Sequence, residues 1–376
     1  MDTVSLNRVA VVSSAQTQLR ESWNRLQHVD LISRAVSGAL KGSGLRIQDI
    51  DFVVDCGSDV LDGRSISNCG FLGALGAHHK EEARVEEDGL FGLIYAATKV
   101  AAGSAQAVLL VAYSKPSESS VADYYATLTE PFYQRGIGVN HVVAAGLMAN
   151  QYVTRYDIAD ETLARVAARA WQRADANSNV EVLSVPTLSD IMSAPFVADP
   201  LRLYELARPV DGAVAIVIAT EEVARRVTTN PVWITGMGSS MDSHFLADRA
   251  PAELEACRVA TTMALRRAGL SIDSIGLAEF SASSAATEAM VVEALGFAKP
   301  GEGAKVYLAD GDVEFNPSGG SIPADPIMAT GAVRLHEAAS RLAGRIGSTQ
   351  ATKALVHGAG GIGMQNHCVV TLEVSS

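Results

Sequence analysis

Two segments of the chain, one in each half, carry the same residue pattern without a gap. Residues 31–56 read LISRAVSGALKGSGLRIQDIDFVVDC, and residues 256–281 read ACRVATTMALRRAGLSIDSIGLAEFS. The identical pairs are Ala35/Ala260, Ala39/Ala264, Leu40/Leu265, Gly44/Gly269, Leu45/Leu270, Ile47/Ile272 and Ile50/Ile275. In each copy, apolar residues at helical spacing end at a glycine, which suits a left-handed C-cap, and an apolar run of strand length follows. The repeat predicts two similar αβ halves packed face to face, with a ligand site where they meet.

A second, shorter repeat predicts the contact between the halves. Gly89, Ala96, Ala97 and Ala101 match Gly331, Ala338, Ala339 and Ala343 at one constant offset. We expect central helices at residues 89–102 and 331–343, because small residues let two helices pack closely. We assign residues 1–228 to an N-terminal half and residues 229–376 to a C-terminal half. The insertion at about 114–208 is expected to be a loop subdomain that covers a ligand site.

Composition and charge exclude several classes of protein. The 376 residues are 48% hydrophobic and 19% charged, which predicts a sizeable core. A net charge of −12 with scattered Lys and Arg disfavours nucleic acid and anionic membranes as partners. The most apolar stretch, residues 212–219, is far shorter than a membrane span, and residues 9–12 are too short for a signal peptide. The four cysteines lack metal-ligand spacing, so we predict reduced thiols, no metal site and a cytoplasmic location.

Three short segments are candidates for the ligand site. Residues 357–364, HGAGGIGM, resemble a phosphate-binding loop. Such a loop needs a helix directly after its glycines, and here a strand pattern follows. We therefore predict a tight turn beside a ligand. Residues 316–332, NPSGGSIPADPIMATGA, form a long irregular stretch before the second central helix, and we predict that they line a pocket. The carboxylates of Glu86, Glu87 and Asp88 are interpreted as capping groups of the first central helix.

Taken together, these features resemble the thiolase superfamily, and within it the sterol-carrier-protein-x type of thiolase. The resemblance rests on VADPLRLYELARPVDGAVAIVIATEEVARR (197–226), NPSGG…ADPIMATGA, AGLSIDSIGLAEF and ALVHGAGGIG, in this order and together with the duplication. It covers nearly the whole chain. It implies an α/β fold of five layers, αβαβα, with the two central helices between two mixed sheets.

The resemblance also implies Claisen chemistry on coenzyme A thioesters, in which a cysteine at the start of the first central helix takes the acyl group. The positions that match the family's reacting residues are Gly89 for this cysteine, Asp325 for the histidine that activates it, Ser281 for the Asn or His of an oxyanion hole, and Gly358 for the second cysteine. Ser283 matches a cysteine of sterol-carrier-type members. Because glycine cannot attack a thioester, the match predicts a chain without an acyl-cysteine step.

Three functions fit this pattern. The first is a non-thiolytic subunit of an acyl-CoA complex, as a homodimer or as a heteromer with a thiolase-like chain, with a small zinc-ribbon/OB-fold protein as a further candidate partner. The second is a thioester-dependent carbon–carbon lyase of the retro-aldolase type, or an acyltransferase without an acyl-cysteine. Asp325 would then be the base, and Ser281, Ser283 or His357 would donate hydrogen bonds, although no tyrosine in the pocket motifs supplies an acid. The third is an acyl-CoA-binding protein. No tightly bound cofactor is expected, and a coenzyme A thioester is a candidate ligand or substrate.

Overall fold

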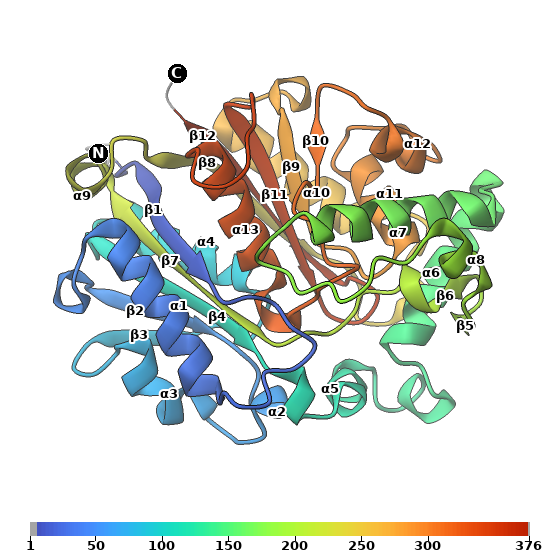
Figure 1. Ribbon diagram of the computed structural model, residues 1–376, viewed down its shortest axis with the longest axis horizontal. Helices are drawn as coiled ribbons and strands as arrows, with labels where there is room; N and C mark the ends of the chain where they lie inside the picture. The colour runs from blue at the N-terminus through green and yellow to red at the C-terminus, as the bar shows by residue number, and fades with distance from the viewer. Residues whose placement is uncertain (1–5, 375–376) are drawn as a thin grey trace.

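One mixed sheet of ten strands organises residues 6–374, the part of the chain that this computed structural model describes (Figure 1). Its order is β10-β9-β11-β12-β8-β1-β7-β4-β2-β3. The strands of the N-terminal half are β1 (Val9–Gln16), β2 (Phe52–Cys56), β3 (Glu81–Arg84), β4 (Ala107–Ser114) and β7 (Gly212–Thr220). Those of the C-terminal half are β8 (Val232–Met241), β9 (Leu277–Phe280), β10 (Glu314–Phe315), β11 (Lys353–Gly360) and β12 (Asn366–Val374). From the middle outward, each half follows the same order, as the repeat predicts.

The two half-sheets are joined edge to edge. β1 and β8 pair antiparallel, with Val9 opposite Ile234 and Val11 opposite Val232. The two mixed sheets that the resemblance implies are therefore continuous in this chain. The pairing covers two strand edges whose backbone groups would otherwise lack hydrogen-bond partners.

Two central helices lie between the half-sheets, as expected from the small-residue repeat. α4 (Gly89–Ala101) contacts β4 and β11, and α13 (Thr330–Leu342) contacts β9 and β1 as well as α4. The outer layer of the N-terminal half contains α1 (His28–Ser43) and α3 (Ser67–Leu75). In the C-terminal half, α10 (Glu255–Ala268) covers β8 and β12, and α11 (Ala285–Ala294) packs beside it. The layered α/β architecture is confirmed (Figure 1).

The two copies of the long repeat end their helices in the same way. α1 stops at Gly44, with a φ of 69°, and α10 stops at Gly269, with a φ of 66°. Residues with a Cβ rarely adopt this left-handed conformation, so glycine at both positions explains why each helix ends there.

The insertion between β4 and β7 is mostly helical. It contains α5 (Val121–Leu128), α6 (His141–Tyr156), α7 (Asp160–Asp175) and α8 (Leu188–Ser193), followed by the paired strands β5 (Phe196–Ala198) and β6 (Leu201–Arg202). α6 and α7 pack on α11, and α7 also contacts α12 (Gly303–Leu308). The short helices α2 (Asp59–Asp62) and α9 (Glu221–Val227) complete the set. Among the described residues, no helix combines the length and apolar character needed to cross a bilayer.

The structure differs from the sequence expectations at strand ends. β11 continues to Gly360, so the glycine-rich turn begins at Gly361 and not at Gly358. β3 was not predicted, because its residues, EEAR, are charged and do not alternate with apolar ones. Charged residues are typical of an edge strand, and β3 lies at the end of the sheet.

Candidate functional site

A cavity lies where the N-terminal ends of both central helices meet the inserted segment. It encloses about 840 Å³ of space not filled by atoms, part of which is open to solvent. Its wall includes Glu87 and Asp88, Tyr124 and Tyr125, His141, Ser281 to Ser283, Asp325 and Thr330, and Ala359 to Gly361. Both halves contribute, and several residues of the 316–332 loop line it, as the sequence predicts. Of the candidate site residues, the cavity brings together Ser281, Ser283 and Asp325.

Asp325 is held in place by the backbone and by one hydroxyl group. Its backbone N–H donates to the Arg208 carbonyl at 2.8 Å, and its own carbonyl accepts from Val210 at 3.1 Å. The hydroxyl of Thr330, the first residue of α13, donates to its carboxylate. Burial raises the pKa of Asp325 to about 6, although the Thr330 hydrogen bond opposes the shift. The carboxylate is therefore a base that is ionised at neutral pH and stays close to its titration range.

Asp88 caps both central helices at once. As the N-cap of α4 it accepts a hydrogen bond from the Leu90 N–H at 3.0 Å, and it accepts a second from the Gly331 N–H of α13 at 2.7 Å. Capping of the first helix is confirmed for Asp88, whereas Glu86 accepts from the Asp59 N–H and Glu87 from Asp88 and Asn366. The bond to the second helix was not predicted. Burial raises the pKa of Asp88 to about 8, against the effect of these two hydrogen bonds. Its neighbour Glu87 accepts from the Asn366 amide at 2.5 Å.

Two tyrosines from the insertion complete the wall, and the sequence analysis did not place them there. The Tyr124 hydroxyl lies 3.3 Å from the Met328 sulfur. The Tyr125 ring stacks on His141, with ring centroids 4.1 Å apart. Burial raises the pKa of both tyrosines and lowers that of His141 to about 4, so phenol and imidazole are neutral at pH 7. The cluster of aromatic residues at 124–133 is visible in the sequence, but nothing in its spacing shows that these residues lie beside the loop at 316–332.

Ser281 lies on the cavity wall, and His357 lies behind it. The Ser281 N–H and hydroxyl donate to the backbone carbonyl of His357 at 3.1 and 3.3 Å. The His357 ring is fully buried and contacts His367, with 2.9 Å between Nε2 and Nδ1. Its side chain is absent from the cavity wall, which corrects the hypothesis that it donates to a ligand there. The Ser283 hydroxyl lines the cavity and lies 3.3 Å from that of Thr287.

None of the cavity-lining residues in the described range is a cysteine. Cys56, Cys257 and Cys368 are buried elsewhere, and Cys69 is exposed on α3. Burial raises the pKa of each of the three buried thiols, which disfavours the thiolate form that acyl transfer requires.

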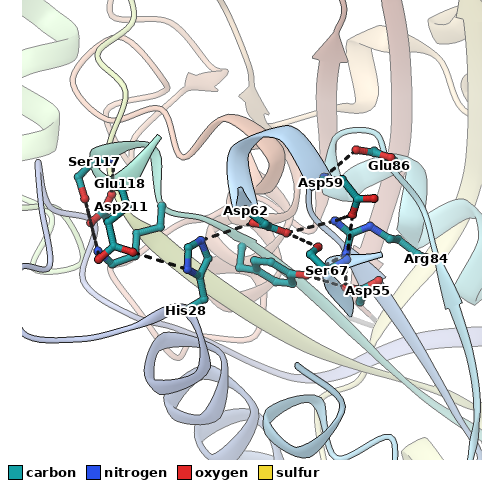
Figure 2. Close-up of polar contacts among 12 residues, drawn as sticks. His28, Asp55, Asp59, Asp62, Ser67, Arg84, Glu86, Ser117, Glu118 and Asp211 are labelled. Atoms are coloured by element: carbon teal, nitrogen blue, oxygen red, sulfur yellow. Dashed lines mark hydrogen bonds and ion pairs between the residues drawn. The ribbon is translucent and has the colours of Figure 1, made fainter. Parts of the chain in front are cut away.

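A buried charge network supports the side of the cavity formed by the N-terminal half (Figure 2). Arg84 of β3 lies between two carboxylates, with Nη1 at 3.0 Å from Asp55 and Nη2 at 3.2 Å from Asp62. The Tyr113 hydroxyl also donates to Asp55, at 2.8 Å, and His28 of α1 lies 3.5 Å from Asp62. Removing one partner would leave a buried charge without compensation, so the network fixes the position of α2.

The position of α2 matters for the cavity because α2 contacts α5. Leu61 of α2 belongs to one apolar cluster with Tyr124, Ile327 and Met328. The network thereby holds the Tyr124 wall against the loop that carries Asp325.

Comparison with known proteins shows which families the chain is similar to. The family described as Thiolase C-terminal domain-like matches residues 238–373. An acetyl-CoA acetyltransferase of Methanothermobacter thermautotrophicus is 27% identical over 94% of this chain and 97% of its own length. A steroid side-chain-cleaving aldolase of Thermomonospora curvata is 26% identical over 84% of this chain and 83% of its own length. Among solved structures, "Ltp2-ChsH2(DUF35) aldolase" superposes with a TM-score of 0.82 at 22% identity, covering 99% of both chains. The chain has a thiolase-like fold and is similar over nearly its whole length to proteins of the thiolase superfamily.

Gly89 and Gly358, which the resemblance predicts at the positions of the thiolase cysteines, are packed against other atoms and do not line the cavity. A Cβ at Gly89 would lie 2.6 Å from the Ala332 Cβ and 2.8 Å from the Ala112 Cβ. A Cβ at Gly358 would lie 2.5 Å from the Asp88 carboxylate. A thiolase-type thiol at either position would therefore require the surrounding residues to move.

Proposed function

We propose that this thiolase-like chain is a thioester-dependent carbon–carbon lyase of the retro-aldol type, acting on β-hydroxyacyl thioesters without a covalent acyl-cysteine. One observation carries the proposal. The cavity between the halves combines an ionised carboxylate at Asp325 with neutral hydrogen-bond donors and no thiol. These groups suit proton transfer and oxyanion stabilisation, and they do not suit acyl transfer. The aldolase relative and the aldolase structure named above are consistent with the same chemistry.

The reaction that these side chains can support is balanced without a cofactor. The Asp325 carboxylate takes the proton of the substrate's β-hydroxyl group as the Cα–Cβ bond breaks. The β-carbon leaves as the carbonyl carbon of a ketone or aldehyde, and the bonding electron pair moves to the α-carbon and its thioester oxygen. The Ser283 hydroxyl donates a hydrogen bond to this enolate, and the Ser281 hydroxyl does so after rotating away from the His357 carbonyl. Protonation of the α-carbon, by the proton now on Asp325 or by the phenol of Tyr125, gives the shortened thioester.

A coenzyme A thioester is the proposed form of the substrate. The apolar part of the wall, including Leu206, Ile327 and Met328, suits an apolar group on the leaving carbonyl. Near neutral pH, the negative charge of Asp325 makes the cavity unfavourable for acyl groups that carry their own carboxylate.

A partner chain is the second element of the proposal. The solved neighbour is a complex of Ltp2 with ChsH2(DUF35), and we propose that this chain likewise works as part of a heteromer. A subunit that supports an active thiolase-like chain, with no turnover of its own, is the alternative role.

The test is incubation of the purified chain, alone and with its co-purifying partner, with β-hydroxyacyl-CoA and β-ketoacyl-CoA thioesters. Mass spectrometry should detect a shortened acyl-CoA and a ketone or aldehyde from the hydroxyacyl compounds, and no acylated protein. Turnover of β-ketoacyl-CoA with an acyl adduct on a side chain would contradict the proposal. No turnover of either class, with or without the partner, would leave the supporting-subunit role in its place.

A further inference from the structure

Three metal-ligating side chains meet on the outer face of the C-terminal half-sheet. Cys257 of α10, His357 of β11 and His367 of β12 each offer one ligand atom, and these atoms lie within 4.8 Å of one another. All three side chains are buried. This cluster lies outside the cavity, and the proposed reaction uses none of its side chains.

The sheet register explains why the two histidines meet. β11 and β12 pair antiparallel, with His357 opposite Val369 and Ala359 opposite His367. The histidines are therefore diagonal neighbours on one face, and α10 covers that face. Their rings are 2.9 Å apart between Nε2 and Nδ1, and Nδ1 of His357 has no hydrogen-bond partner among the described residues.

These distances are close to those of a metal site. Bonds of about 2.0 Å to imidazole and about 2.3 Å to thiolate place neighbouring ligand atoms of a tetrahedral Zn²⁺ roughly 3.3 to 3.7 Å apart. An ion at this position would replace the hydrogen bond between the two rings and separate their nitrogens by a few tenths of an ångström, and it would draw together ligand atoms that now lie up to 4.8 Å apart. Such a shift is within reach of side-chain torsions.

The types of ligand atom also suit a metal, because imidazole nitrogen and cysteine sulfur are common ligands of Zn²⁺. Coordination by Cys257 would release the thiol proton to solvent, as metal binding to cysteine generally does.

We propose that Cys257, His357 and His367 bind one Zn²⁺ ion, with a water as the fourth ligand. His367 also lines a small surface pocket, so one member of the cluster can be reached from outside. The other walls of this pocket include Met148, Leu254 and Met364 and the charged residues Asp242, Arg249 and Glu253. The ion would fasten α10 to β11 and β12. Because the His357 carbonyl holds Ser281, it would also stiffen one wall of the cavity.

The test uses the reduced, full-length chain, stripped with a chelator and then loaded with Zn²⁺ or Co²⁺. We expect about one equivalent of Zn²⁺ by elemental analysis, a rise in Tm, and, with Co²⁺, a thiolate-to-metal charge-transfer band. Cys257→Ala should abolish the band, and His367→Gln should weaken Zn²⁺ binding by roughly tenfold or more. The matched control is Cys69→Ser, which removes the exposed thiol and should leave all three signals unchanged.

The measurements on the wild-type protein test the proposed Zn²⁺ site even if a variant fails to fold. A wild-type chain with neither a charge-transfer band nor a rise in Tm would overturn the proposal. A band that survives Cys257→Ala and disappears in Cys69→Ser would also overturn it, since the ion would then be on the surface.

Discussion

At the scale of single residues, two carboxyl groups at one cavity titrate in different ranges. Burial raises the pKa of Asp325 to about 6 and that of Asp88 to about 8. Both groups line the cavity, but their neighbours differ. The charges of Glu87 and Asp325 raise the pKa of Asp88 further, whereas the Thr330 hydrogen bond and the charge of Arg334 lower that of Asp325. At pH 7 one group is mostly ionised and the other mostly protonated. Enzymes separate the roles of base and acid in this way.

Asp325→Asn tests the proposed base. An amide cannot take the hydroxyl proton, so kcat/KM for thioester cleavage should fall by roughly 10²- to 10⁴-fold. In the wild type, kcat/KM should rise as the pH passes about 6, because the base acts in its ionised form. Asp123→Asn, an exposed carboxyl on α5, is the matched control and should leave the rate unchanged. Activity of Asp325→Asn within twofold of the wild type would rule out this role.

Asp88→Ala tests the double cap. The variant leaves the Leu90 and Gly331 N–H groups without their acceptor, and each lost cap costs about 1 kcal/mol. The free energy of unfolding in urea should therefore fall by about 2 kcal/mol. Glu86→Ala removes a neighbouring carboxylate that accepts one bond from the Asp59 N–H, and it should cost about 0.5 kcal/mol. Equal losses in the two variants would contradict the double cap.

At the scale of elements, the contact between α4 and α13 depends on small residues. Ala96, Ala97, Ala338 and Ala339 are fully buried between the half-sheets. A Cβ at Gly331 would lie 2.0 Å from the Asp88 carboxylate, so this glycine makes room for the shared cap. Close packing and capping are therefore coupled at the cavity end of both helices.

Gly89→Cys tests this packing and, at the same time, the lost thiolase chemistry. Neither Gly89→Cys nor its combination with Asp325→His should restore acyl transfer, because the new side chain would overlap Ala332 and Ala112. Gly89→Ala should lower the free energy of unfolding by about 1–3 kcal/mol, as overpacking does. At Gly136 a Cβ would meet no atom within 4 Å, so Gly136→Ala is the matched control. An acyl adduct on residue 89 of the double variant would show that the pocket still accommodates the thiolase reaction.

At the scale of the whole molecule, the fold buries carboxyl groups far apart in the sequence. Burial raises the pKa of Asp55, Glu205 and Glu288 to about 7 and that of Asp88 to about 8, against about 4 in an unfolded chain. The folded chain thus keeps protons that the unfolded chain has lost. Their stabilising contribution is complete at low pH and disappears as the pH rises through 7 and 8.

The free energy of unfolding should therefore fall between about pH 6.5 and pH 9. The neutral buried histidines have the opposite effect, but only below about pH 6.5, where the unfolded chain binds protons at its imidazoles. Urea titrations at pH 6.5, 7.5 and 8.5 measure the slope, and Asp88→Asn should make it shallower. A stability that is constant or rises over this range would contradict the pKa values.

The parts of the fold that could be predicted from the sequence are those specified locally. Residues 31–56 and their copy at 256–281 each have apolar residues at helical spacing, a glycine and an apolar run. Each copy therefore determines a helix, its C-cap at Gly44 or Gly269, and the strand that follows. The loop at 316–332 was predicted as a pocket wall from its length and its place before a helix. Asp325, Ser281 and Ser283 entered the candidate site through the resemblance to thiolases, because they match positions of that family's reacting residues.

Tertiary structure alone decided which other side chains reach the site. Tyr124 and His141 come from the insertion, Asp88 meets α13 through the contact between the halves, and Cys257 meets the two histidines because α10 covers their strands. In each case the partners are far apart in the sequence, and helix and strand periods carry no information about which distant surfaces pack together. The sequence by itself determined the duplicated halves and the pocket-lining loop at residues 316–332. The chemistry of the cavity and the metal-ligand cluster arose only when long-range packing brought the halves and the insertion into contact.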